Sequence, residues 1–129
     1  MSRKSKGTNA ERELIHLFWA NGWSACRVAG SGCTKYPSPD VLAGNNVRKL
    51  AIECKVTKDI RQYFTSKEIH ELKQFSAIFG AEPWVGIKFN NVDWYFVTME
   101  DLGGTGEGHS VTLENAKRKG FLFKELVEH

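Results

Sequence analysis

A short hairpin in the first half of the chain limits its fold and chemistry more than any other segment. Residues 40–43 have the composition of a strand, a Gly-Asn-Asn turn follows, and residues 50–56 read as the returning strand. Because side chains alternate along a strand, Glu53 and Lys55 share one face. Strand pairing makes Asp40 a direct or diagonal neighbour of Glu53, at roughly 5–8 Å. The hairpin therefore predicts two carboxylates and an ammonium on one patch of sheet.

This combination of side chains favours metal-dependent hydrolysis. Two carboxylates suit Mg²⁺, which takes acidic oxygen ligands and keeps several waters. A neighbouring lysine orients or activates an attacking water, or neutralises charge on a phosphate. The alternative is a solvent-facing, salt-bridged strand edge, which an isolated Glu-x-Lys tripeptide would favour. Apolar neighbours indicate a partly buried hairpin instead and support a nuclease-like site: Val41, Leu42, Ile52 and Cys54.

A third carboxylate, Glu11, lies on a helix that precedes the hairpin. The helix is expected from Thr8 to about Ala20, where an Asn-Gly pair ends it. The spacing of Glu11 places it on the apolar stripe with Leu14, Ile15 and Phe18. The helix alone leaves two interpretations open: a capping box with Thr8, or a position near the metal. Asp40 and the Glu-x-Lys pair favour the second.

Five segments, taken in order, resemble the archaeal-type Holliday junction resolvases of the PD-(D/E)xK nuclease superfamily. They are Lys6-Gly7, residues 10–14, residues 27–32, residues 37–45 and residues 51–55. The resemblance runs from about Lys6 to Phe96, and little of it remains past Met99. The superfamily motif by itself is weak. The ordered set with Glu11-Arg12, Arg27 and the Gly-Ser-Gly loop is far more specific.

The resemblance implies a structure-selective endodeoxyribonuclease that resolves four-way DNA junctions by paired, metal-dependent phosphodiester hydrolysis, an activity that serves DNA recombination and repair. The catalytic residues expected on this basis are Glu11, Ser31, Asp40, Glu53 and Lys55. The cofactor expected is Mg²⁺, with Mn²⁺ as a substitute, on Glu11, Asp40, Glu53 and the backbone carbonyl of Cys54. Ser31 belongs to a loop that contacts DNA in the family.

Charge is distributed in a way that fits a DNA partner. The net charge is only +3, but basic residues gather at the N-terminus and around the predicted site, and acidic ones collect toward the C-terminus. The residues expected to bind DNA are Arg3, Lys4, Lys6, Arg12, Arg27, Ser31, Lys35 and Lys58. No base-reading module is visible, so recognition of junction shape through the backbone is expected.

A second helix is expected over residues 66–79, because Thr65 and Glu68 form a capping box and Gly80 follows. An apolar stripe on such a helix usually packs inside its own chain. The resemblance implies instead a homodimer interface that involves Leu72, Phe75 and Phe79. A two-fold homodimer would place two equivalent sites on a nearly two-fold junction.

The expected elements predict one α/β domain over residues 1–129, with a central mixed sheet of about five strands flanked by helices, as in restriction endonucleases. The active-site half covers about residues 6–60. The C-terminal residues 100–129 are poorly defined, apart from a helix that Thr112 caps. Residues 121–123 are compatible with strand, helix or dimer contact.

Other site types and functions are less favoured. Cys26, Cys33 and Cys54 contain no C-x-x-C pair, so they predict neither a disulfide framework nor a zinc site. The Gly30-Ser31-Gly32 loop precedes no helix, so no small-molecule cofactor is expected. The chain shows no signal peptide or membrane span, and a cytoplasmic protein is expected. Two alternative functions remain: a related nuclease that nicks or cuts other DNA, and a non-catalytic DNA-binding module.

Overall fold

The computed structural model describes residues 3–30, 35–104 and 108–129, with side chains described from Gly7 onward. Its centre is a six-stranded sheet with strand order β1–β2–β3–β5–β6–β8. Strands β3 and β5 are parallel, and every other neighbouring pair is antiparallel. The strands of this sheet are β1 Ser24–Arg27, β2 Val41–Gly44, β3 Lys49–Thr57, β5 Glu82–Phe89, β6 Trp94–Thr98 and β8 Phe121–Leu122.

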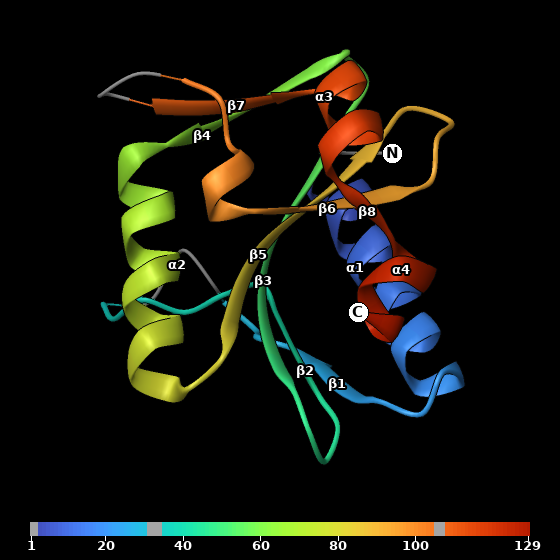
Figure 1. Ribbon diagram of the computed structural model, residues 1–129, viewed down its shortest axis with the longest axis vertical. Helices are drawn as coiled ribbons and strands as arrows, with labels where there is room; N and C mark the ends of the chain where they lie inside the picture. Colours follow the sequence, from blue (N-terminus) through green and yellow to red (C-terminus); the bar gives the residue numbers. More distant parts are fainter. Residues whose placement is uncertain (1–2, 31–34, 105–107) are drawn as a thin grey trace.

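Helices cover both faces of the sheet, and a separate ribbon lies at one end (Figure 1). The helices are α1 Arg3–Ala20, α2 Ser66–Phe79, α3 Leu113–Lys119, α4 Phe123–Glu128 and the short 3-10 helix η1 Met99–Asp101. The ribbon pairs β4 Arg61–Thr65 with β7 Gly108–Thr112. Within the described ranges, no helix is long and apolar enough to span a bilayer.

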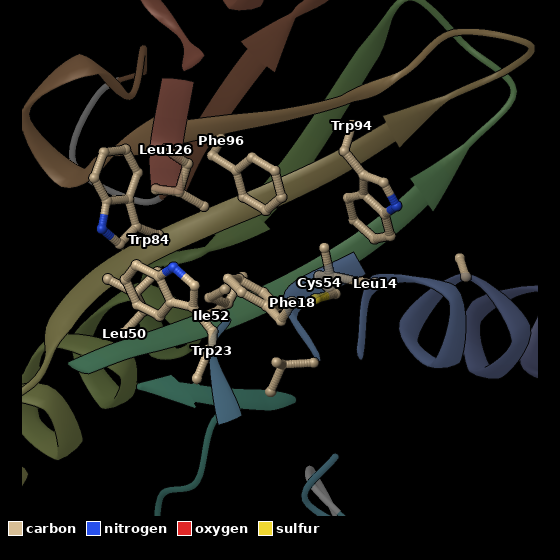
Figure 2. Close-up of a cluster of buried hydrophobic side chains, with 13 residues drawn as sticks. Leu14, Phe18, Trp23, Leu50, Ile52, Cys54, Trp84, Trp94, Phe96 and Leu126 are labelled. Atoms are coloured by element: carbon tan, nitrogen blue, oxygen red, sulfur yellow. The ribbon is translucent and has the colours of Figure 1, made fainter. Parts of the chain in front are cut away.

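The two faces of the sheet have separate hydrophobic cores. On one face, α1 and α4 pack against side chains that alternate along β3, among them Leu50, Ile52 and Cys54 (Figure 2). On the other face, α2 buries Ile69 and Leu72 against the sheet. Full burial of one such aliphatic or aromatic side chain contributes about 1.5–3 kcal/mol. The central strand β3 is therefore fixed from both sides.

The hairpin forms as the sequence predicts. Val41 pairs with Ile52, and Gly44 pairs with Lys49. The side chain of Asn45 closes the turn, because its Oδ1 accepts hydrogen bonds from the backbone nitrogens of Val47 at 2.8 Å and Arg48 at 2.7 Å. This pairing fixes the register, and a slip by one residue would move every side chain to the wrong face.

The second helix also agrees with its prediction. Thr65 is the N-cap of α2, its Oγ1 accepts from the backbone nitrogen of Glu68 at 3.0 Å, and Glu68 Oε1 accepts from the backbone nitrogen of Thr65 at 2.9 Å. Gly80 ends the helix at φ 84°, a left-handed conformation that glycine adopts without strain. Both ends of α2 are thus fixed by local hydrogen bonds.

Several elements differ from the sequence-based expectation. The strands β4 and β7, the 3-10 helix η1 and the helix α4 were not predicted. The sheet has six strands rather than about five, because residues 121–122, for which strand was one of three options, form β8. β4 exposes Arg61 and Tyr63 on alternate positions and buries Phe64, so it lacks a clear apolar run. The first helix begins at Arg3 rather than Thr8, which places Thr8 inside the helix. Free cysteines on strands usually pack as small buried hydrophobes, as Cys54 does, but Cys26 is exposed on β1.

Candidate active site

Asp40 and Glu53 lie side by side at the open end of the hairpin. Because Val41 pairs with Ile52, the next positions outward are Asp40 and Glu53. Their carboxyl groups share a hydrogen bond. Asp40 Oδ2 also accepts a hydrogen bond from the backbone nitrogen of Cys54 at 2.8 Å, which fixes the aspartate against β3. The predicted carboxylate pair is therefore present and oriented.

The surroundings of the pair disfavour the charged form of Glu53. Burial, followed by the neighbouring Asp40 carboxylate, raises the pKa of Glu53 to about 9. At neutral pH Glu53 is therefore protonated in the metal-free protein, and its carboxyl O–H donates a hydrogen bond to Asp40. Burial also raises the pKa of the Cys54 thiol well above its usual range, so this sulfur stays a neutral core group. A cation placed at the two carboxylates would reverse the preference of Glu53 for its neutral form.

Lys55 lies on the same face of β3 and makes an ion pair that the sequence did not reveal. Lys55 Nζ is 2.6 Å from Glu68 Oε2, the free end of the capping carboxylate of α2. Burial lowers the pKa of Lys55, but the bond to Glu68 and the attraction of Glu53 and Asp40 outweigh this effect and raise it. The ammonium therefore stays charged. The capping-box spacing identified Glu68 as a cap, but no sequence signal linked it to Lys55.

Glu11 approaches the pair from α1. Its Oε1 is 3.1 Å from Arg27 Nε on β1. Burial raises the pKa of Glu11, the hydrogen bond from Arg27 opposes this, and the charge of Asp40 adds to the increase. Since Thr8 lies inside α1, Glu11 does not cap the helix with it. Between the two interpretations left open, the structure favours the position near the carboxylate pair.

These residues line one polar cavity of about 370 Å³ between β3, the start of α2 and the segment that precedes β2. Its walls include Glu11, Asp40, Glu53, Lys55 and Glu68. Lys35 and Tyr36 form the outer rim, where Lys35 Nζ lies 5.9 Å from the centre of the Tyr36 ring. A larger hollow of about 990 Å³ beside Trp19 and Phe79 is mainly apolar, and no carboxylate lines it among the described residues.

The donors fit a hard divalent cation. Asp40 and Glu53 supply carboxylate oxygens, and the Cys54 carbonyl belongs to the residue between Glu53 and Lys55. In the described ranges, no three His, Cys, Asp or Glu side chains gather closely enough to hold an ion by themselves. Two carboxylates with a carbonyl suit Mg²⁺ or Mn²⁺, which fill their remaining positions with water, and do not suit zinc.

The predicted DNA-binding residues are only partly visible. Arg12, Lys35 and Lys58 are exposed, whereas Arg27 is half-buried by its bond to Glu11. Ser31 lies outside the described residues. Arg3, Lys4 and Lys6 lie in the first turns of α1, and their side chains are also outside the described part.

The apolar residues of α2 divide between the core and the surface. Phe75 and Phe79 stack on each other with ring centres 5.2 Å apart, and Phe79 is 49% exposed. Ile78 beside them is 82% exposed. Leu72 differs, because it is only 4% exposed and packs against its own sheet. It therefore belongs to the core of this chain, and the apolar surface of α2 consists of Phe75, Ile78 and Phe79.

Comparison with known proteins identifies the family to which the chain is similar. Residues 2–129 match the family model of the archaeal Holliday junction resolvases. The chain is 38% identical to the crossover junction endodeoxyribonuclease Hjc of Archaeoglobus fulgidus, with 95% of each chain covered. It is 32% identical to that of Methanocaldococcus jannaschii, with 95% of this chain and 86% of the relative covered.

A solved structure from the same family has a similar fold. The crystal structure of Archaeoglobus fulgidus Hjc, described as a Holliday junction resolvase from an archaeal hyperthermophile, superposes with a TM-score of 0.86 at 33% identity. The match covers 95% of this chain and 96% of that one. The predicted fold class, a single α/β domain with a mixed sheet of the restriction-endonuclease type, is confirmed.

Proposed function

The chain belongs to the archaeal Holliday junction resolvase family, and we propose that it is a structure-selective endonuclease that resolves four-way DNA junctions by paired phosphodiester hydrolysis. The observation that carries this proposal is the single cavity that brings Asp40, Glu53 and Lys55 together. A plain salt-bridged strand edge would leave these groups in solvent. Here Glu53 is buried enough that its pKa reaches about 9 without a cation.

Asp40, Glu53 and the Cys54 carbonyl would hold Mg²⁺, with Mn²⁺ as a substitute. When bound, the ion supplies Lewis-acid stabilisation of a phosphate oxygen and lowers the pKa of a bound water. The backbone nitrogen of Cys54 orients the Asp40 carboxylate. Glu11, held 3.1 Å from Arg27, would help to place this ion or a second one.

The basic residues of the site contact the scissile and flanking phosphates. The Lys55 ammonium orients the attacking water and stabilises the negative charge that develops on the phosphate. Arg27 uses Nε for Glu11, so its two terminal nitrogens face a phosphate in this proposal. Arg12, Lys35 and Lys58 bind the backbone further out, together with Ser31 and the N-terminal basic residues Arg3, Lys4 and Lys6.

Two copies of the chain would form the working unit. A four-way junction has approximate two-fold symmetry, and two symmetric nicks need two equivalent sites. The exposed apolar surface of α2, made by Phe75, Ile78 and Phe79, supports a homodimer about this helix. Leu72 is not part of the proposed interface, because it is already buried.

The test is cleavage of an end-labelled synthetic four-way junction in Mg²⁺, beside a linear duplex of the same sequence. We expect paired, symmetric nicks in the junction alone. Glu53→Gln keeps the size of the side chain and removes the carboxylate, so cutting should be lost while junction binding persists. Glu100→Gln, at an exposed carboxylate in η1, serves as the matched control.

The alternatives predict different products. Equal cutting of the linear duplex would indicate a general nuclease of the same superfamily. Tight binding of the junction without cutting, in either Mg²⁺ or Mn²⁺, would indicate a non-catalytic DNA-binding module. Full activity in Glu53→Gln would show that the chemistry occurs elsewhere.

A further inference from the structure

Lys55 is held by a residue that also begins a helix. Glu68 directs one carboxylate oxygen to the backbone nitrogen of Thr65 at 2.9 Å and the other to Lys55 Nζ at 2.6 Å. The two side chains of the ion pair are 30% and 27% exposed. One carboxylate thus connects the first turn of α2 to the lysine on β3.

The capping box and the packing of α2 fix the position of Glu68 independently of Lys55. Its backbone nitrogen bonds to Thr65 Oγ1 at 3.0 Å, and the helix that follows buries Ile69 against the sheet. A lysine, by contrast, has a flexible four-carbon side chain, and fixing it in one conformation costs up to about 2 kcal/mol of rotamer entropy. An anion fixed at a helix start is therefore able to restrict the ammonium to a single place in the cavity.

We propose that Glu68 is a positioning residue of the nuclease site and acts through Lys55, a role that rests on the proposed function. The two carboxylate oxygens of Glu68 have different partners and different roles. Oε1 completes the cap of α2, while Oε2 directs the ammonium toward the space beside Asp40 and Glu53. The helix start and the lysine position are thereby set together.

A purely structural role makes a different prediction. Glutamine serves in a capping box as well as glutamate does. Glu68→Gln therefore keeps the oxygen that accepts from Thr65 and removes the charge that attracts Lys55. If Glu68 were only a cap, this substitution would leave both stability and catalysis unchanged.

The chain offers a matched control for this substitution. Glu125 occupies the same third position of α4, where its Oε1 accepts from the backbone nitrogen of Leu122 at 2.9 Å. It has no ion pair among the residues that the structure describes. Glu125→Gln makes the same chemical change at the same helix position, away from the cavity, although the N-cap of α4 is Leu122 rather than a threonine.

The experiment compares three quantities for the full-length protein: the single-turnover cleavage rate of a four-way junction, the junction Kd, and the unfolding midpoint. Glu68→Gln should lower the rate about tenfold to a hundredfold, as expected when a reacting group is misplaced by about an ångström. The Kd should stay within about twofold. The cap is kept, so the free energy of unfolding should fall only by the loss of the half-buried ion pair, about 1 kcal/mol or less. Glu125→Gln should match the wild type in all three.

A second variant separates the cap from the charge. Thr65→Ala removes the acceptor for the Glu68 nitrogen and should reduce the free energy of unfolding by about 1 kcal/mol. It keeps the Lys55 partner, so the rate should remain near that of the wild type. A rate that falls with Thr65→Ala as much as with Glu68→Gln would assign the effect to the fold and overturn the inference.

The remaining outcomes distinguish the inference from the proposed function. Wild-type rates in Glu68→Gln, with cutting lost in Glu53→Gln, would overturn the positioning role and leave the nuclease assignment intact. No cutting by the wild-type protein would remove both. A lower rate in Glu68→Gln alone, with unchanged Kd and no greater loss of stability than in Thr65→Ala, is the result that the structure predicts.

Discussion

Replacing Glu53 by Gln should stabilise the metal-free protein, and the gain should grow with pH. In the unfolded chain Glu53 titrates near 4.5, whereas burial and Asp40 raise its pKa to about 9 in the folded protein. Between these values the folded state binds one more proton than the unfolded state. The stability associated with this group is complete below about pH 4.5 and declines as the pH rises toward 9.

The magnitude follows from one proton. The loss is about 1.4 kcal/mol per pH unit, so it amounts to about 2.7 kcal/mol between roughly pH 5.5 and 7.5. Glu53→Gln removes this slope, because an amide does not titrate. The free energy of unfolding of the variant relative to wild type should therefore rise by about this amount over that interval.

The assay is urea unfolding followed by circular dichroism, in EDTA and at one fixed protein concentration, at several pH values across this interval. Glu100→Gln, at an exposed site on η1, controls for the general loss of one carboxylate. A stability difference between Glu53→Gln and wild type that does not change with pH would refute the reasoning. It would show that Glu53 is ionised in the folded protein without a cation.

Four further predictions concern the metal, the core, the first helix and the proposed dimer. Binding of Mg²⁺ near pH 7 should release about one proton, because Glu53 must ionise. Calorimetry in two buffers of different ionisation enthalpy measures this release. Equal heats of binding in the two buffers would contradict the prediction. Gly86→Ala should destabilise the fold by about 1–3 kcal/mol in urea unfolding, since the added Cβ would lie 2.9 Å from the Phe96 ring. Gly7→Ala on α1, where nothing lies within 4 Å of such a Cβ, should instead stabilise it by about 0.5–1 kcal/mol. Ile78→Glu should sediment as a monomer at micromolar concentration, whereas wild type and Lys73→Glu, changed on another face of α2, should sediment as the proposed dimer. A dimer in Ile78→Glu would contradict an interface at this position.

The sequence predicted the carboxylate pair because strand geometry is local. Alternation along β3 places Glu53 and Lys55 on one face, and the turn at Asn45 fixes which residue lies opposite Asp40. Capping rules likewise placed both ends of α2. Each of these inferences needed only residues that are close together in the chain.

The missed contacts depend on distant elements. Arg27 and Glu11 come from β1 and α1, and Lys55 meets Glu68 only because α2 starts beside β3. Sequence periodicity within one element cannot predict such contacts between distant elements. For a related reason the sequence missed β4, which pairs with the distant β7, and left the two-residue β8 open, because β8 takes its place by pairing with β6.

The proposed enzyme cuts a junction in two symmetric places through the site at Asp40, Glu53 and Lys55. A supercoiled plasmid that extrudes a cruciform tests it most directly. A single nick relaxes the plasmid and the cruciform is reabsorbed, so only two nicks made in one binding event give a linear product. Wild-type protein in Mg²⁺ should produce linear plasmid directly, and Glu53→Gln should leave it supercoiled. Accumulation of nicked circles, or linear product from Glu53→Gln, would contradict the account.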